Sequence, residues 1–260
     1  MTDAILPRRE TGDAADPRPP VVFLHGLAGD RLAWEGLQDR TDPPRRTIAF
    51  DLPGHGDARD WPVRGHAGIA ARAVRQSLDR LGIARFHLVG HSMGGAVACL
   101  VAMAAPDGVA SLTLLAPGGF GTEINARLLR RFARAQAAGD LAPLVEAFFG
   151  FASPVPDGLV ELMAAMRAEP GRTAAFGEIA EAILDGDRQG RLDLDRLADA
   201  PFPARVIWGD SDAVLPHRQM DAAPPAFARH LLPGVGHMPH IERPDLVLRL
   251  IGQSLNGGAG

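Results

Sequence analysis

The sequence predicts an α/β fold, with a mostly parallel twisted sheet, helices on both faces and a helical cap insertion. Three observations predict it. Short apolar runs alternate with longer stretches of helical periodicity. The short runs are almost continuously hydrophobic, which is typical of strands buried on both faces of a parallel sheet. One long stretch, residues 120–200, departs from the alternation because it contains helical patterns and few strand-like runs.

Six apolar runs are the predicted strands, and each is followed within two residues by glycine, proline or aspartate. They are residues 21–24, 47–50, 86–89, 111–115, 205–208 and 228–232. Predicted helices occupy residues 67–81, 94–105 and 245–255. The first of these stops at Gly82 and the second before Pro106, which are common helix-ending signals. Strands that alternate with helices imply right-handed crossovers and one parallel sheet.

Residues 120–200 are predicted to form a helical cap over the carboxyl-terminal edge of the sheet. Glycine, proline and aspartate residues separate its helical patterns. Ligands of α/β proteins bind at that edge, so a cap there would enclose the substrate. The predicted core then consists of residues 1–119 and 201–260.

Composition excludes several kinds of chemistry. The formal net charge of −4 gives no indication of a nucleic-acid partner. The single cysteine, Cys99, allows neither an intramolecular disulfide nor a cysteine-based zinc site. All 27 cationic side chains are arginines, and tyrosine is absent. Phosphate loops of the Walker type, Schiff-base enzymes and Ser-x-x-Lys acyl enzymes all need a lysine and are therefore excluded.

Other absences lead us to expect a cytoplasmic protein without cofactor or metal. The first residues contain no apolar signal region, and the longest small-apolar run, residues 96–105, is far shorter than the ~20 residues of a membrane span. His237 and His240 do not form an H-E-x-x-H zinc motif, and no G-x-G-x-x-G dinucleotide motif occurs. The sequence does not indicate an oligomeric state.

The strongest chemical signal is the segment Gly-His-Ser-Met-Gly-Gly at residues 90–95. It directly follows a predicted strand and opens a predicted helix, which is the context of a G-x-S-x-G nucleophile elbow. The glycines allow a turn so sharp that a Cβ on either side would strike the neighbouring backbone. The turn exposes the hydroxyl of Ser92 beside a helix N-terminus, where a developing anion is favoured.

A serine nucleophile needs a base and an acid, and both have candidates in loops that follow predicted strands. His237 is the predicted base, with His240 as its competitor. Asp212 is the predicted acid, although Asp210 lies in the same loop and either residue could simply form a turn. The order Ser92, Asp212, His237 is the order of nucleophile, acid and base that accompanies this kind of elbow.

The oxyanion hole and the acyl pocket complete the predicted site. The backbone N–H groups of Met93 and Leu27 are the expected oxyanion donors. Gly26 would let the loop that carries Leu27 approach the substrate closely. The cap is expected to supply apolar lining, and the predicted residues are Phe148, Phe149, Phe151 and Met166.

These motifs together resemble the α/β-hydrolase fold superfamily, from Val21 to Pro244. Residues 50–56, Phe-Asp-Leu-Pro-Gly-His-Gly, resemble the family's turn after its second parallel strand. His237 with Glu242 and Pro244 is similar to the family's His-x4-Glu-x-Pro ending. The resemblance implies the same nucleophile, acid and base. It also implies leading antiparallel strands, which we expect to be short or partly absent here because only about twenty residues precede Val21.

A narrower resemblance involves residues 114–125. They are similar to the hydrolase-like domain of the dihydrolipoamide acetyltransferase component of acetoin dehydrogenase. Those proteins carry a lipoyl domain, whereas this chain has no lysine to lipoylate.

The sequence therefore predicts a serine hydrolase that cleaves a small or medium acyl ester or thioester. Acyl transfer, carbon–carbon bond hydrolysis and lactone opening use the same triad and stay open as alternatives. A non-catalytic or slow ligand receptor on the same fold is the third possibility. In each case the expected partner is a small molecule.

Overall fold

A seven-stranded sheet forms the centre of the computed structural model, which describes residues 4–41 and 44–256. The strand order is β1-β3-β2-β4-β5-β8-β9. The six predicted strands are all present, as β2 (Val21–Leu24), β3 (Thr47–Phe50), β4 (Phe86–His91), β5 (Val109–Leu115), β8 (Ala204–Gly209) and β9 (Ala228–Leu232). They pair in parallel, so the predicted α/β fold is confirmed.

One short antiparallel strand, β1 (Arg8–Thr11), pairs with β3 at the edge of the sheet. It is the leading strand that the family resemblance implies, shortened to four residues. The predicted core also included residues 1–3, 42–43 and 257–260, which lie outside the described residues.

Alternating side chains of the central strands face two separate apolar layers. Val22 and Leu24 of β2 pack in one layer, and Val21 and Phe23 pack in the other. All four side chains of this strand are completely buried. This two-sided burial explains why the strands are continuously apolar in sequence.

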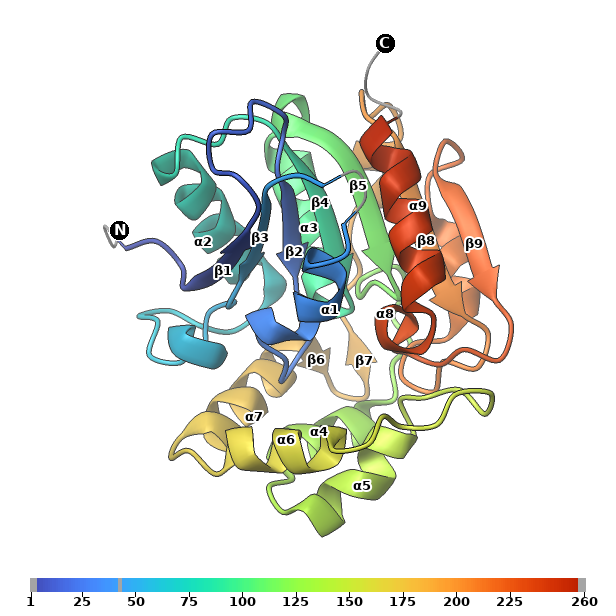
Figure 1. The fold of residues 1–260 in the computed structure, drawn as a ribbon. Helices are drawn as coiled ribbons and strands as arrows, with labels where there is room; N and C mark the ends of the chain where they lie inside the picture. Colours follow the sequence, from blue (N-terminus) through green and yellow to red (C-terminus); the bar gives the residue numbers. More distant parts are fainter. Residues whose placement is uncertain (1–3, 42–43, 257–260) are drawn as a thin grey trace.

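Helices cover both faces of the sheet (Figure 1). α2 (Ala67–Arg80) and α3 (Met93–Ala104) lie on one face, and α1 (Glu35–Gln38) and α9 (Pro244–Asn256) lie on the other. Shorter helical turns connect these elements. They are η1 (Arg31–Trp34), η2 (Gly56–Ala58), η3 (Pro106–Gly108), η4 (Leu194–Leu197), η5 (His217–Ala222) and α8 (Pro239–Glu242). None of the helices in the described residues combines the length and apolarity needed to cross a membrane.

Four helices between β5 and β8 form a layer beyond the carboxyl-terminal ends of the strands, at the bottom of Figure 1. They are α4 (Ala126–Arg134), α5 (Ala138–Glu146), α6 (Leu159–Arg167) and α7 (Arg172–Ile183). We call residues 120–200 the cap; its limits remain a prediction. The cap also contains a hairpin, β6 (Leu184–Asp185) with β7 (Arg188–Gln189), whose two-residue strands are too short to produce a sequence pattern.

A buried arginine joins three of the cap helices. Arg167, at the end of α6, is completely buried and its Nη1 donates to the carbonyl oxygens of Phe132 and Ala135 at the end of α4, at 2.6 and 3.0 Å. Its guanidinium lies 4.4 Å from the ring centre of Phe132 and 5.4 Å from that of Phe176 on α7. Burial lowers the pKa of Arg167 to about 10, which still leaves it charged at neutral pH.

Candidate active site

Ser92 occupies a strained turn between β4 and α3. Its φ of 53° and ψ of −118° lie in a region that non-glycine residues rarely adopt. A Cβ on Gly94 would lie 2.1 Å from the carbonyl oxygen of Leu24, so only glycine fits there. The strain is held by hydrogen bonds at both ends of Ser92. Its N–H donates to the carbonyl oxygen of Leu115 at 3.0 Å, and its own carbonyl accepts from Gly118 at 2.9 Å.

His237 and Asp212 are brought together by loops that follow two different strands. His237 Nδ1–H donates to Asp212 Oδ2 at 2.8 Å, and both side chains are almost wholly buried. Since a carboxylate only accepts hydrogen bonds, this contact places the proton on Nδ1 and leaves Nε2 able to accept one. That is the tautomer a general base requires.

Asp212 is fixed by further donors. Its Oδ1 accepts from the N–H groups of Val214 and Leu215 at 2.8 and 2.9 Å, and its Oδ2 also accepts from Trp208 Nε1 at 2.9 Å. The competing acid does something different. Asp210 accepts from the N–H of Gly234 at 2.8 Å, and no hydrogen bond joins it to His237 in the described part of the chain. Asp210 therefore shapes its turn, and Asp212 faces the histidine.

Glu242 positions the loop that carries His237. Its buried carboxylate accepts from the N–H groups of Gly236, Met238 and Gly150 at 2.9 to 3.2 Å. The N–H of His237 in turn donates to the carbonyl oxygen of Phe148 at 2.7 Å. The sequence showed Glu242 only as part of a motif, because its bonds to backbone groups depend on how the loop folds.

The two predicted oxyanion donors lie beside Ser92. Within the described residues, neither the Leu27 nor the Met93 N–H has a protein acceptor. A Cβ on Gly26 would lie 3.2 Å from the Cβ of Ser92, so the absence of a side chain there allows the Gly26–Leu27 loop to approach the nucleophile. Both N–H groups are therefore available to an oxygen atom bound at Ser92.

Two buried histidines bond to the backbone near the Gly26–Leu27 loop. His55 Nε2 accepts from the N–H of Ala28 at 3.1 Å, and His25 Nε2 accepts from the N–H of Leu52 at 3.0 Å. Burial lowers the pKa of His25 and lowers that of His55 well below its usual range. Both rings are consequently neutral and can accept these bonds.

His91 bonds to the backbone of His237. Its Nε2–H donates to the carbonyl oxygen of His237 at 2.8 Å. Burial, together with the neighbouring His240 and His237, lowers the pKa of His91 well below its usual range. His240 lies against His91, with ring centres 4.5 Å apart, and within the described ranges no hydrogen bond joins it to Asp212. Of the two competing histidines, only His237 is paired with a carboxylate.

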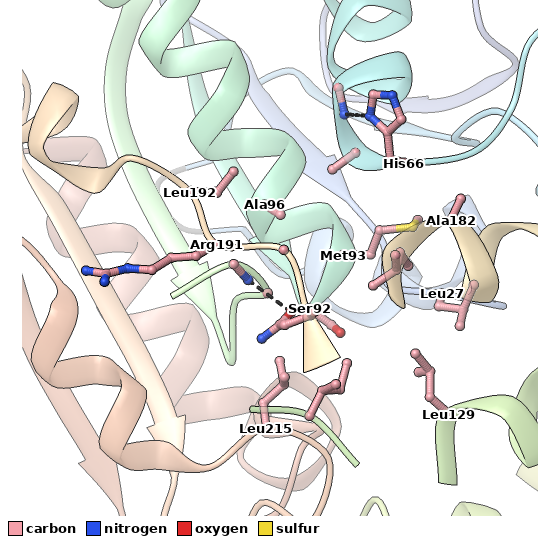
Figure 2. A pocket seen from close by; sticks show the side chains of 18 of the residues that line it. Leu27, His66, Ser92, Met93, Ala96, Leu129, Ala182, Arg191, Leu192 and Leu215 are labelled. Carbon is pink, nitrogen blue, oxygen red and sulfur yellow. Dashed lines mark hydrogen bonds between the residues drawn. The ribbon is translucent and has the colours of Figure 1, made fainter. Parts of the chain in front are cut away.

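Ser92 lines two cavities. The first has a volume of about 210 Å³ and is shown in Figure 2, with Ser92 and Met93 at the start of α3. Its apolar walls include Ala96, Leu129 and Leu192. The Arg191 side chain also borders it, but the guanidinium points away from Ser92 in Figure 2. The second cavity has a volume of about 120 Å³ and contains His237 as well as Ser92.

The predicted pocket residues divide into two groups. Gly26 and Phe148 line the second cavity. Phe149 is buried but lines neither cavity. Phe151 is 89% exposed beside Gly234 and lines neither cavity, so its role in the acyl pocket stays a prediction.

Met166 lines neither cavity, and Met163, on the same helix, lines the second one instead. The sequence showed α6 as apolar but did not define which of its methionines faces the site. Leu159 of α6 and Phe132 of α4 also line this cavity.

A model of the family described as alpha/beta hydrolase fold matches residues 19–244. The chain belongs to this family. Over 228 residues it is 39% identical to the dihydrolipoyllysine-residue acetyltransferase component of the acetoin cleaving system of Pseudomonas putida, which covers 88% of this chain. The chain spans 61% of that relative's length.

Two further comparisons cover nearly the whole chain. It is 30% identical over 247 residues to the 2-succinyl-6-hydroxy-2,4-cyclohexadiene-1-carboxylate synthase of Salmonella agona, covering 91% of this chain and 94% of that one. The structure of a meta-cleavage product hydrolase from Pseudomonas fluorescens IP01 is similar, with a TM-score of 0.84 at 20% identity and coverage of 96% and 93%. The second comparison supports the α/β-hydrolase fold.

Proposed function

We propose that this protein is a serine hydrolase that cleaves an ester or thioester of a small or medium acyl group. Ser92 is the nucleophile, His237 the base and Asp212 the acid. The observation that carries the proposal is the 2.8 Å bond from His237 Nδ1 to the buried Asp212, with His237 and Ser92 lining the same cavity. No hydrogen bond joins Ser92 to His237 in the described residues, and such bonds often form only when substrate is present.

Acylation begins when His237 Nε2 takes the proton of the Ser92 hydroxyl. The oxygen of Ser92 bonds to the carbonyl carbon, and the carbonyl oxygen becomes an oxyanion that Leu27 and Met93 N–H stabilise. The carbon–oxygen or carbon–sulfur bond then breaks. The leaving alcohol or thiol departs with the proton from His237.

Deacylation repeats these steps with water. His237 takes a proton from water, and the resulting hydroxide bonds to the acyl carbon. The bond to Ser92 then breaks, and the serine oxygen recovers its proton from His237. Asp212 stabilises the imidazolium that forms in both halves of the reaction.

Acyl transfer is the second candidate. The observation that favours it is the 39% identity to an acetyltransferase component. Transfer differs from hydrolysis only in which nucleophile reaches the acyl-enzyme. Carbon–carbon bond cleavage and lactone opening need the same groups, whereas a ligand receptor would bind without turnover.

The test is hydrolysis of p-nitrophenyl esters from acetate to octanoate by the wild type, Ser92→Ala and a matched control, Ser254→Ala. Ser254 is buried near the end of α9, on the sheet face opposite α3, and bonds to the Leu250 carbonyl. Loss of the nucleophile in a serine triad lowers kcat by up to about 10⁶-fold. We expect such a loss in Ser92→Ala and none in Ser254→Ala.

Added alcohols and thiols then separate hydrolysis from transfer by the product ratio. Equal turnover by the wild type and a folded Ser92→Ala protein would contradict the proposal.

A further inference from the structure

The second cavity is the side of the site from which the leaving group departs. His237 lines this cavity and does not line the first. Because the leaving oxygen takes its proton from His237, the alcohol portion of an ester must lie beside that ring. The first cavity, on the other side of Ser92, is left for the acyl group. This assignment of the two cavities rests on the proposed function.

Two buried polar side chains without partners line the second cavity. Trp34 is completely buried, and its Nε1–H has no acceptor among the described residues. His240 is 2% exposed, and its Nδ1 has no hydrogen-bond partner. The two rings lie side by side, with centres 4.8 Å apart. Leaving a buried polar group unpaired is costly, so the pair is unusual in a cavity that is otherwise mostly apolar.

The two groups complement each other chemically. Trp34 Nε1 can only donate a hydrogen bond. Burial, with the nearby His237 adding to it, lowers the pKa of His240 to about 3, so its ring is neutral and has one nitrogen that accepts. With the proton of the neutral His240 ring on Nε2, a hydroxyl group can accept from the indole and donate to Nδ1 at the same time. A carbonyl oxygen could satisfy only the donor, and an ammonium only the acceptor.

We infer that Trp34 and His240 form a hydroxyl-binding subsite in the second cavity, which selects esters whose leaving alcohol carries a further hydroxyl. The favoured substrates are thus acyl esters of diols and related polyols. The apolar walls from Phe132, Leu159 and Met163 hold the carbon chain of that alcohol. An ordered water molecule is the competing occupant of the same pair.

The test compares esters that share one acyl group and differ only in the alcohol. 2-Hydroxyethyl butyrate and propyl butyrate have nearly the same size, as do 3-hydroxypropyl and butyl butyrate. We expect the wild-type kcat/KM to favour the hydroxylated ester in at least one pair by about tenfold, the effect of one well-made hydrogen bond to a buried group. A wild type that favours the alkyl ester in both pairs would overturn the inference.

Trp34→Phe keeps the ring and removes only the donor. It should abolish the preference, because kcat/KM falls more for the hydroxylated ester than for the alkyl ester. Trp61→Phe is the matched control, because Trp61 lines neither cavity. His240→Phe should act in the same direction as Trp34→Phe. An unchanged preference in a folded Trp34→Phe protein would overturn the inference, because it would mean that water and not the substrate hydroxyl binds Trp34 and His240.

A binding measurement separates this inference from the proposed function. In the Ser92→Ala protein, the indole N–H resonance of Trp34, assigned by its loss in Trp34→Phe, should shift with 2-hydroxyethyl or 3-hydroxypropyl butyrate. The alkyl esters should shift it much less. This readout needs no turnover. If Ser92 is not the nucleophile but the shift is selective, the subsite stands. If no shift occurs, the subsite fails even where esters are cleaved.

Discussion

The sheet side of the site and the cap side are held by different forces. On the sheet side, the carboxylates of Asp212 and Glu242 each accept bonds from several backbone N–H groups. On the cap side, Arg167 is completely buried, and its guanidinium lies against two aromatic rings. Only its Nη1 donates hydrogen bonds, to two backbone carbonyls, and its other two guanidinium nitrogens have no partner among the described residues. The groups proposed for the chemistry are therefore fixed by directional bonds. The groups that would shape the substrate pocket are fixed mainly by packing, which tolerates more change.

The sharpest way to break this comparison is Asp212→Asn. The amide cannot hold the His237 tautomer as a carboxylate does, and the equivalent change in serine triads lowers kcat by about 10⁴-fold. We expect a loss of that size in steady-state ester hydrolysis, with the fold retained. Asp210→Asn is the control and should leave kcat essentially unchanged, because Asp210 bonds to Gly234 and not to His237. The reverse pattern would move the acid to Asp210.

Glu242→Gln probes the loop that carries the base. The change removes the charge from a carboxylate that accepts from three backbone N–H groups. Hydrogen bonds to a charged group contribute about 1.5–3 kcal/mol each, so we expect the free energy of unfolding to fall by about 2 kcal/mol. Urea unfolding measures this, and the kcat should fall with it. Unaltered stability would mean that the loop is held by its other contacts.

The buried histidines predict a loss of stability in acid. Burial lowers the pKa of His240 to about 3, whereas the unfolded chain protonates it near its ordinary value of 6.5. The unfolded state therefore binds more protons below that value. The contribution of neutral, buried His240 to the free energy of unfolding is present in full above pH 6.5 and is lost as the pH falls toward 3.

Each such histidine contributes a slope of about 1.4 kcal/mol per pH unit. We expect His240→Phe to reduce the pH dependence of urea unfolding between neutral and acidic pH by about one proton. His240 suits this test because Nδ1 makes no hydrogen bond that the change would remove. A slope identical to that of the wild type would contradict the prediction.

Arg167→Met sharpens the contrast on the cap side and has the smallest expected effect. Methionine fills a similar volume without a buried charge, and such replacements are often neutral for stability. The end of α4 loses its bonds to Arg167, however, and Leu129 and Phe132 of that helix line the cavities. We expect the preference among p-nitrophenyl esters to shift severalfold while acetate is still cleaved. Unchanged chain-length preference would show that packing alone sets the position of α4.

Residues whose role depends on local backbone geometry could be predicted from the sequence. A strand, glycines and a helix define the turn of Ser92, so its sequence predicts it, and burial on both faces makes the strands continuously apolar. The choice between Asp210 and Asp212 depended on a contact with a residue far along the chain. Met163 and Met166 differ only in the direction they face on α6, which packing decides. The burial of Arg167 produces no sequence pattern.

The cap is hydrogen-bonded directly to the loop that carries His237. Phe148 and Gly150, where the cap chain leaves α5, are bonded to the His237 loop and to Glu242. A hinge at this point would pull the base out of line whenever the cap opened. These hydrogen bonds hold the α5 end of the cap in place. A movement of the cap that admits substrate without displacing His237 therefore has to take place at its opposite end, near α7 and the β6–β7 hairpin.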